Sequence, residues 1–381
     1  VFSLLVISLV FKALTTYVQI RFVEMLQYNI SKRLMERYLS QTYSWFLARH
    51  SADFAKNILS EVGNVLGSGV TPLIDLIAKG TVAIALLTLL IIADPKVAII
   101  VGFSLSISYA LIYKFTKSYV SRMGEERFKK NQKLFTSISE AFGAIKEVKM
   151  GGLENVYVNR FSEPAQIIAR NIASSSVIAQ LPRFILEGVA FGGIMLLILY
   201  QMKQTGSFNN SLPVISLYAF AGYRLLPSLQ QIYGSFSRFA FIGASLDNIY
   251  DDFKKLKKFD LDYKDESITV KKIIKLKNIH YNYPDASRTA LNNISLSIPI
   301  NTTVGLVGAT GSGKTTTVDI ILGLLEPQKG ILEVDNKIIT QQNIRAWQKC
   351  IGYVPQHIYL SDDTVAANIA FGVDPKNILK S

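Results

Sequence analysis

The chain contains the stretch Gly308-Ala309-Thr310-Gly311-Ser312-Gly313-Lys314-Thr315, which matches the pattern G-x-x-x-x-G-K-[ST] in full. An apolar, β-branched run at 302–307 precedes this stretch, and a run typical of a helix follows it at 316–325. Strand, glycine loop and helix in this order are the context in which the pattern binds phosphate. The sequence therefore predicts a nucleotide-binding α/β domain, although a glycine-rich turn with a chance lysine would give the same letters.

The residue types of this loop suit a triphosphate. Its glycines permit positive φ, so backbone N–H groups can turn toward anionic oxygens at the N-terminus of the following helix. We predict that the ammonium of Lys314 lies against the β and γ phosphates and that the hydroxyl of Thr315 binds Mg²⁺. ATP and Mg²⁺ are thus the expected cofactors, and Thr316 completes the expected ATP-binding segment 308–316.

The composition divides the chain into two parts. It is 49% hydrophobic and 18% charged, with a mean hydropathy of +0.27, which is apolar for a soluble protein. Residues 1–250 hold the long uncharged runs, whereas residues 251–381 have the composition of an ordinary α/β domain. We therefore expect a transmembrane domain at 1–250, a charged linker at 251–267 and the nucleotide domain at 268–381.

The net charge of +13 arises from 41 basic and 28 acidic side chains. Much of the excess flanks apolar runs, which indicates the cytoplasmic face of a membrane and gives no reason to expect a nucleic-acid partner. Basic residues are dense at 114–133, whereas the short segment 94–96 carries a single lysine, so 114–133 is assigned to the cytoplasm. Cys350 is the only cysteine, which excludes an intrachain disulfide.

Five apolar runs have the length to cross a bilayer, whose hydrocarbon core of about 30 Å needs about 20 helical residues. The first continues into a long cytoplasmic extension, and the second and third form a hairpin around the turn Asp94-Pro95-Lys96. A polar outer loop is expected at 203–211, between the last two. The predicted spans lie at about 1–22, 73–93, 97–115, 176–202 and 212–237.

Several charged residues lie inside these runs. Asp75 and Lys79 are one turn apart, so they either neutralise each other within the bundle or lie near the membrane interface. Arg183, with Glu187 at i+4, and Arg224 are candidates for contact with an anionic substrate, because an intramembrane arginine is costly unless it is used. The alternative is an arginine near a helix end that pairs with a neighbouring helix or reaches the interface.

The nucleotide domain resembles the first part of the ATPase domain of an ABC transporter. The resemblance extends over residues 273–373 and rests on Tyr283-Pro284, the phosphate loop and Ile351-Gly352-Tyr353-Val354-Pro355-Gln356. The apolar runs before it resemble an exporter-type (type IV) membrane domain without its first spanning helix. The expected fold class is therefore an α-helical transmembrane bundle followed by a partial α/β P-loop NTPase domain.

The resemblance implies roles for individual residues. Tyr283 is similar to the aromatic residue that stacks on adenine, and Gln356 to the glutamine that reaches Mg²⁺ and the attacking water. The implied catalytic residues are accordingly Lys314 and Gln356, and the implied Mg²⁺ ligands are Thr315 and Gln356. Taken alone, Tyr283 also fits a strand end and Gln356 a plain loop. Residues 48–62 and 137–145 resemble intracellular coupling segments that dock on the ATPase domains.

The segment 217–233 resembles the last spanning helix of bacterial lipid-linked oligosaccharide flippases. This resemblance implies ATP-driven movement of a lipid-linked oligosaccharide, or a similar amphipathic and anionic substrate, by a homodimer in the bacterial inner membrane. Arg183 and Arg224 are the implied substrate residues. Export of a drug, a peptide or a bare lipid is the alternative within the class. A truncated, non-catalytic nucleotide-binding membrane subunit is the alternative from another class.

The chain also departs from the family pattern. In the family, the signature sequence LSGGQ, the second acidic motif and the switch histidine follow the region that Gln356 resembles, and the last residue here is Ser381. The chain begins within an apolar run and without an initiator methionine. We therefore expect a fragment without the first spanning helix and the C-terminal half of the ATPase domain. By itself it should hydrolyse almost no ATP, whereas the full-length parent is expected to be a transport ATPase.

Overall fold

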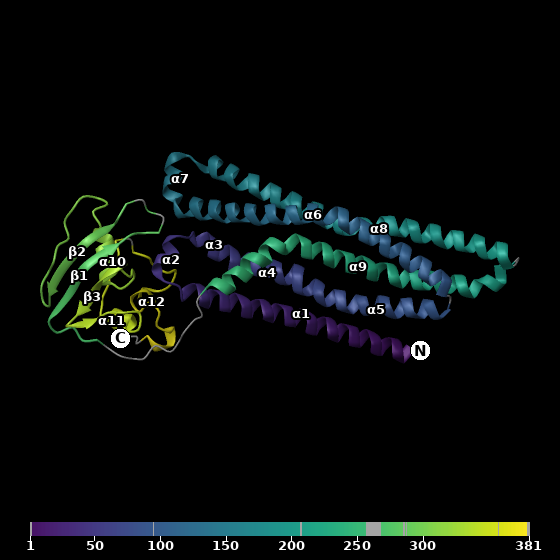
Figure 1. Ribbon diagram of the computed structural model, residues 1–381, viewed down its shortest axis with the longest axis horizontal. Helices are drawn as coiled ribbons and strands as arrows, with labels where there is room; N and C mark the ends of the chain where they lie inside the picture. The colour runs from purple at the N-terminus through teal and green to yellow at the C-terminus, as the bar shows by residue number, and fades with distance from the viewer. Residues whose placement is uncertain are drawn as a thin grey trace. The chain divides into compact units, whose positions relative to one another are not determined.

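The structure is a computed structural model that describes residues 2–93, 95–205, 208–256, 268–284, 286, 288–356 and 358–378. It divides into two compact units, which we describe separately. The helical unit comprises residues 1–41 and 45–260, and the sheet unit comprises residues 42–44 and 261–381. Figure 1 shows long helices in the first unit and a small sheet with short helices in the second.

Five long helices make up most of the described residues of the helical unit. Between them, short helices fill the connections, and two of these, η1 and η2, are π-helical turns inside a rod that stays helical from Ser51 to Ala93. The long helices are α1 (Phe2–Leu39), α5 (Thr71–Ala93), α6 (Pro95–Gly143), α8 (Glu154–Thr205) and α9 (Phe208–Lys255). The short elements are α2 (Tyr43–Leu47), α3 (Ser51–Lys56), η1 (Asn57–Glu61), α4 (Val62–Val65), η2 (Leu66–Val70) and α7 (Ile145–Gly151).

Helix α9 is the element around which the helical unit is packed. It contacts α5, α6 and α8, and it also contacts the π-helical turns of the 51–93 rod. The buried core near its C-terminal end comes from α1, the rod and α9, and consists of Val23, Leu34, Tyr38, Val62, Leu66, Ile249 and Leu256. In Figure 1, α9 accordingly runs beside α4 and α5.

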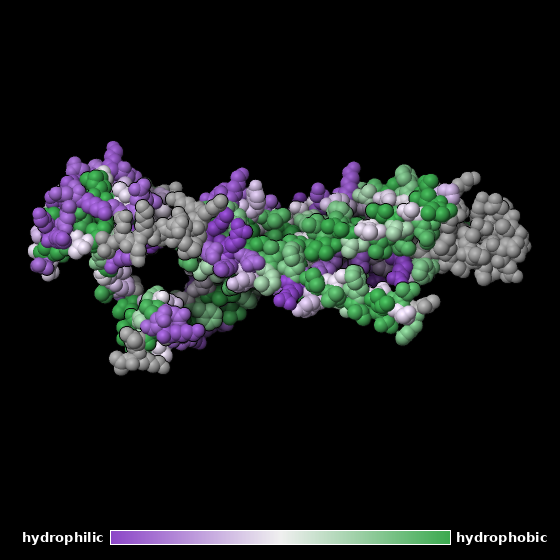
Figure 2. All heavy atoms as spheres, turned by 90° about the horizontal axis from the view of Figure 1, so that it is seen from below, coloured by the Kyte–Doolittle hydropathy of each residue, from purple (hydrophilic) through white to green (hydrophobic). Residues whose placement is uncertain are grey.

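Two helices of the described chain are long and apolar enough to cross a membrane, namely Phe2–Leu39 and Ser51–Ile92. Most of the apolar side chains along the first half of α1 are exposed, from Phe2 to Phe22. Figure 2 shows apolar side chains gathered over the helices, whereas hydrophilic ones dominate the surface of the sheet unit. The other predicted spans fall within α6, α8 and α9, and their crossing of the membrane stays a prediction.

The predicted outer loop at 203–211 is wrong. Helix α8 continues to Thr205 and α9 already begins at Phe208, so most of the segment is helical, and residues 206–207 lie outside the described residues. Polar residues also occur within helices, so the polarity of a segment does not by itself predict a loop. Of the predicted turn at Asp94-Pro95-Lys96, Asp94 lies outside the described residues, and Pro95 begins α6.

The sheet unit contains an antiparallel sheet in the order β2-β1-β3-β4. Its strands are β1 (Ile273–Tyr281), β2 (Leu291–Pro299), β3 (Lys329–Val334) and β4 (Lys337–Ile338). Helices α10 (Lys314–Ile321), α11 (Ile344–Gln348) and α12 (Val365–Ile369) and the short 3₁₀ turn η3 (Pro375–Asn377) accompany it. Ile279 and Trp347 are in its core, where the Trp347 indole N–H donates to the Ile321 carbonyl at 2.7 Å.

The apolar runs at 302–307 and 350–354 each predict a strand from the sequence, but neither run forms one. The segments 302–307 and 350–354 are irregular, and Val307 and Val354 are 97% and 86% exposed. An extended segment becomes a stable strand only when a neighbouring strand accepts and donates its backbone hydrogen bonds, and the described sheet offers these two segments no neighbour. The predicted α/β character is nevertheless present, since pairs of strands are followed by helices from β1 to α12.

Candidate functional site

The phosphate loop ends in a glycine that no other residue could replace without strain. Gly313 is the N-cap of α10 and has φ 88°, and Gly311 has φ 81°. A Cβ atom on Gly313 would lie 2.5 Å from Leu291 Cδ2 and 2.8 Å from the Ala290 carbonyl oxygen. The loop therefore packs tightly on the start of β2, and its left-handed backbone directs the first turn of α10.

Lys314 is folded back over the loop. Its ammonium donates to the carbonyls of Gly308 and Ala309 at 2.7 and 2.8 Å, and to Ser312 Oγ at 3.3 Å. These acceptors are neutral, and no acidic side chain in the described part of the chain forms a salt bridge with Lys314. An uncompensated positive charge beside a helix N-terminus, within a largely exposed loop, is suited to a phosphate group.

The three threonines after Lys314 are placed differently. Thr315 is exposed, whereas Thr316 and Thr317 are buried. Thr317 donates its hydroxyl to the Gly313 carbonyl at 2.9 Å, and the Thr316 hydroxyl lies 3.1 Å from the Tyr283 hydroxyl. Thr315 is thus the hydroxyl in an accessible position for a cation. The role of Thr317 was not predicted, although a threonine that bonds back four residues is a recognisable local pattern.

Tyr283 is held against the first turn of α10. Besides its contact with Thr316, its ring packs edge-on against Tyr281, with ring centroids 5.1 Å apart. Burial raises the pKa of Tyr281, so its phenol stays neutral beside Tyr283. The structure therefore brings the predicted aromatic residue to the same helix turn as the phosphate loop, and leaves its ring half-buried.

Gln356 is exposed and follows the irregular segment 350–354. Among the described residues no hydrogen bond joins it to the phosphate loop. Its assignments as a catalytic residue and as a Mg²⁺ ligand stay predictions.

The two predicted substrate residues have different partners. Arg183 on α8 donates through Nε to Glu187 at 2.8 Å, so its charge is matched one turn along the same helix. The Arg224 guanidinium on α9 lies 6.0 Å from the centre of the Phe220 ring and pairs with no carboxylate in the described residues. Of the two, Arg224 has the charge that an anion could use.

Comparison with protein families identifies both units. Residues 1–222 match the family model described as ABC transporter transmembrane region, and residues 291–380 match the model described as ABC transporter. The chain belongs to the ABC transporter family. Because its helical unit is the family's transmembrane region, this ABC transporter chain is a membrane protein, and the predicted exporter-type fold class is confirmed.

Similar sequences carry the name of a lipid transporter. The ABC transporter chain is 25% identical to the ATP-dependent lipid A-core flippase of Wigglesworthia glossinidia brevipalpis, over 90% of this chain and 59% of that protein. It is 24% identical to the flippase of the same name from Haemophilus influenzae (strain 86-028NP), over 91% of this chain and 59% of that protein. The chain thus spans about 59% of the length of these relatives.

A solved structure has the same fold. The chain superimposes on a bacterial Atm1-family ABC exporter with ATP bound, with a TM-score of 0.78 over 96% of this chain and 64% of that one. The sequences are 17% identical, so this likeness concerns the fold alone.

Proposed function

We propose that this ABC transporter chain uses ATP to export an amphipathic lipid across the bacterial inner membrane, as one of two identical subunits. The observation that supports this most directly is the phosphate loop, in which the Lys314 ammonium lies at the N-terminus of α10 with no carboxylate partner in the described part of the chain. That loop occurs in a chain whose other unit matches the transmembrane region of the same family.

The residues around the loop suit ATP. The amides of residues 308–313 and the ammonium of Lys314 would hold the phosphates, and Thr315 and Gln356 would serve Mg²⁺. Thr316 holds the hydroxyl of Tyr283, which would leave that ring to pack on the adenine. ATP hydrolysis would supply the free energy of transport, and the contribution of these side chains is to bind and orient the triphosphate.

For the cargo, we propose a glycolipid with an anionic headgroup, either lipid-linked oligosaccharide or a lipid of the lipid A-core type. The relatives carry the second name, and the segment 217–233 resembles transporters of the first kind. Arg224 has no carboxylate partner among the described residues and lies beside Leu225, which packs against α5 and α6. Arg183 is the second substrate residue of this proposal, and its pairing with Glu187 makes its contribution smaller.

The test is the ATPase rate of the full-length protein in lipid vesicles, with and without each of the two glycolipids. We expect stimulation by an anionic glycolipid, abolition of turnover by Lys314→Ala, and loss of stimulation by Arg224→Ala. ATPase turnover that neither glycolipid stimulates would favour export of a drug or a peptide instead. Turnover of the wild type no higher than that of Lys314→Ala would instead show a non-catalytic subunit.

A further inference from the structure

The helical unit holds buried polar side chains that nucleotide binding does not use. On α9, Ser245 and Asp252 are buried at heptad spacing, so they lie on the face that also carries Ile242 and Ile249. On η1, Asn57 and Glu61 are buried as well. A polar group in an apolar core costs free energy unless it is hydrogen-bonded, so these residues need partners.

The first set of contacts is the Glu61 cluster, which consists of Glu61, Arg127, Asn131 and Ser245. Arg127 donates through Nη2 to Glu61 at 2.7 Å and to Ser245 Oγ at 2.6 Å, and Asn131 donates to the other Glu61 oxygen at 2.7 Å. The Glu61 and Arg127 side chains are 0% and 6% exposed. This cluster joins η1, α6 and α9 in a dry environment, where removing one partner would strand a buried charge.

The second set is the Asp252 cluster, which consists of Tyr38, Arg49, Asn57 and Asp252. Tyr38 donates its hydroxyl to Asp252 Oδ2 at 2.5 Å, and Asn57 donates to the same oxygen at 3.1 Å. Arg49 lies 3.6 Å from Asp252 Oδ1 and stacks over Trp45 at 4.4 Å. Burial raises the pKa of Tyr38, so its hydroxyl stays a donor. The cluster joins the end of α1, the segment after α2, η1 and the last turn of α9.

The Asp252 cluster fixes the positions of its segments relative to one another but contributes little to the stability of the fold. Its Arg49 side chain is 41% exposed, so the ion pair with Asp252 reaches water and is weak. The buried Oδ1 of Asn57 has no hydrogen-bond partner among the described residues, which costs free energy. Side chains from three other segments of the chain nevertheless converge on the Asp252 carboxylate. Variants of this cluster should therefore fold with little loss of stability, whereas variants of the Glu61 cluster should lose more.

The location of Asp252 in the chain gives the cluster a mechanical role. Asp252 lies in the last turn of α9, and the next element along the described chain is β1, which begins the sheet unit. Its partners Arg49 and Asn57 lie within 48–62, the predicted coupling segment. The end of α9 and the coupling segment are therefore tied to each other through one buried carboxylate.

We propose that the Asp252 cluster is a latch that makes the end of α9 and the coupling segment 48–62 move as one body. Asp252 and Tyr38 are its positioning residues. The role of the latch in transport rests on the function proposed above. Through the latch, a displacement of the nucleotide domain that pulls on α9 also displaces the coupling segment. In the other direction, a displacement of the helices on lipid binding is transmitted to the nucleotide domain and changes its ATPase rate.

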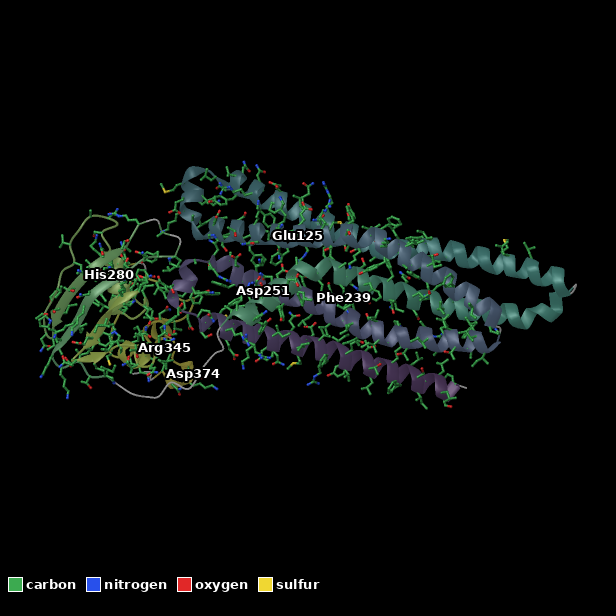
Figure 3. All side chains as sticks on the ribbon, in the orientation of Figure 1. Glu125, Phe239, Asp251, His280, Arg345 and Asp374 are labelled. Carbon is green, nitrogen blue, oxygen red and sulfur yellow. The ribbon has the colours of Figure 1, made fainter. Side chains whose placement is uncertain are left out.

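The test uses the full-length protein in vesicles and compares Tyr38→Phe and Asp252→Asn with Asp251→Asn. Asp251, labelled near the end of α9 in Figure 3, is exposed and pairs with Lys255 one turn along the same helix. We expect the latch variants to keep basal ATPase activity while stimulation by glycolipid falls about fivefold or more, as for loss of an allosteric coupling energy. The control variant should match the wild type. Equal stimulation in all four proteins would overturn the proposal.

A second measurement separates the latch from the proposed function. Spin labels at Ala48 and Lys254, both exposed, report the distance between the coupling segment and the end of α9. We expect one narrow distance distribution in the wild type with and without ATP, and a broad one in Asp252→Asn. If the wild type shows no lipid stimulation but the distances behave in this way, the cargo proposal fails and the latch stands. A narrow distribution in Asp252→Asn would refute the latch.

Discussion

In the phosphate loop, Lys314 donates to Gly308, Ala309 and Ser312, all within its own loop. In the Glu61 cluster, Arg127 donates to partners that lie 66 and 118 residues away in the sequence. Within the described residues, the first cation donates to neutral acceptors and lies in an exposed loop, whereas the second is buried and paired with a carboxylate. The charge of Lys314, whose hydrogen bonds are local, therefore remains available for a ligand. The charge of Arg127 is neutralised by Glu61 and serves to join helices.

The largest expected effect comes from removing the available charge. Lys314→Ala in the full-length protein should lower the ATPase rate by a hundredfold or more, roughly the loss for one group that stabilises developing charge. Thermal unfolding of the helical unit should not change, because Lys314 joins no distant segments. Lys337→Ala, which removes an exposed lysine from β4, is the matched control and should keep full activity. A Lys314→Ala protein with normal turnover would show that the loop charge is not used.

Breaking the ion pair between Glu61 and Arg127 should instead lower the stability of the helical unit. Glu61→Gln leaves the buried Arg127 guanidinium without a counter-charge, and the expected loss of stability is about 3–5 kcal/mol. The double variant Glu61→Leu with Arg127→Met should recover most of this loss, since replacing both partners leaves no stranded charge. Denaturant unfolding in detergent measures both effects. If the double variant is as unstable as Glu61→Gln, the ion pair contributes net stability beyond the free-energy cost of burying its two charges.

The crossing of α6 and α9 next to Arg127 gives a purely steric test of the same region. A Cβ atom on Gly124 would lie 1.8 Å from the Phe241 carbonyl oxygen, so Gly124→Ala should push the two helices apart and destabilise by about 1–3 kcal/mol. Gly243→Ala on α9 is the control, because no atom lies within 4 Å of its added Cβ. Helix propensity predicts that this control gains up to about 1 kcal/mol. Equal unfolding transitions of the two variants would mean that the helices can separate at no cost.

This contrast also explains which features could be predicted from the sequence. The phosphate loop and α10 were predicted because their residues follow one another in a short, recognisable order, whereas Tyr283 was assigned only through the resemblance to ABC transporters. Helices α1 and α5 were predicted because apolar length is a local property. The strands at 302–307 and 350–354 were predicted from composition alone, yet a strand depends on a neighbour that no local pattern reveals.

The buried clusters were missed for a physical reason. Tyr38 and Asp252 are separated by 214 residues, so their hydrogen bond depends on how α1 and α9 pack. One signal was present: Ser245 and Asp252 share a helix face with Ile242 and Ile249, and a polar residue at a heptad position of an apolar face indicates a buried contact. The sequence showed that partners were needed but not which residues would supply them.

Tyr283 offers a smaller test at the nucleotide site. Tyr283→Ala should weaken ATP binding about tenfold or more, since stacking of a base on an aromatic ring is worth about 1–3 kcal/mol. Tyr283→Phe keeps the ring and loses only the contact of the hydroxyl with Thr316, so its effect should be about threefold at most. Equilibrium binding of a fluorescent ATP analogue to the full-length protein measures both. Equal losses in the two variants would assign the role to the hydroxyl and not to the ring.

The smallest effect concerns a second anion site made from backbone amides. Asp335 at the end of β3 accepts hydrogen bonds from the amides of Lys271, Lys272 and Ile273, so the chain's own carboxylate occupies a cradle like the one predicted for phosphate. These amides hold the pKa of Asp335 below its usual range. Because the folded pKa is the lower one, the stabilisation is complete above the unfolded value of about 4 and is lost as the pH falls through the folded value.

Asp335→Asn should therefore lower the unfolding temperature slightly at pH 7, and the difference from the wild type should shrink as the pH falls below about 4. Asp362→Asn, which changes an exposed aspartate in an irregular segment, is the control and should show no such difference. The expected effect is small because Asp335 is partly exposed, so that water competes for the same hydrogen bonds. A difference that stays constant down to low pH would mean that the side chain acts through its shape and not through its charge, and the likeness to the phosphate loop would then be only geometric.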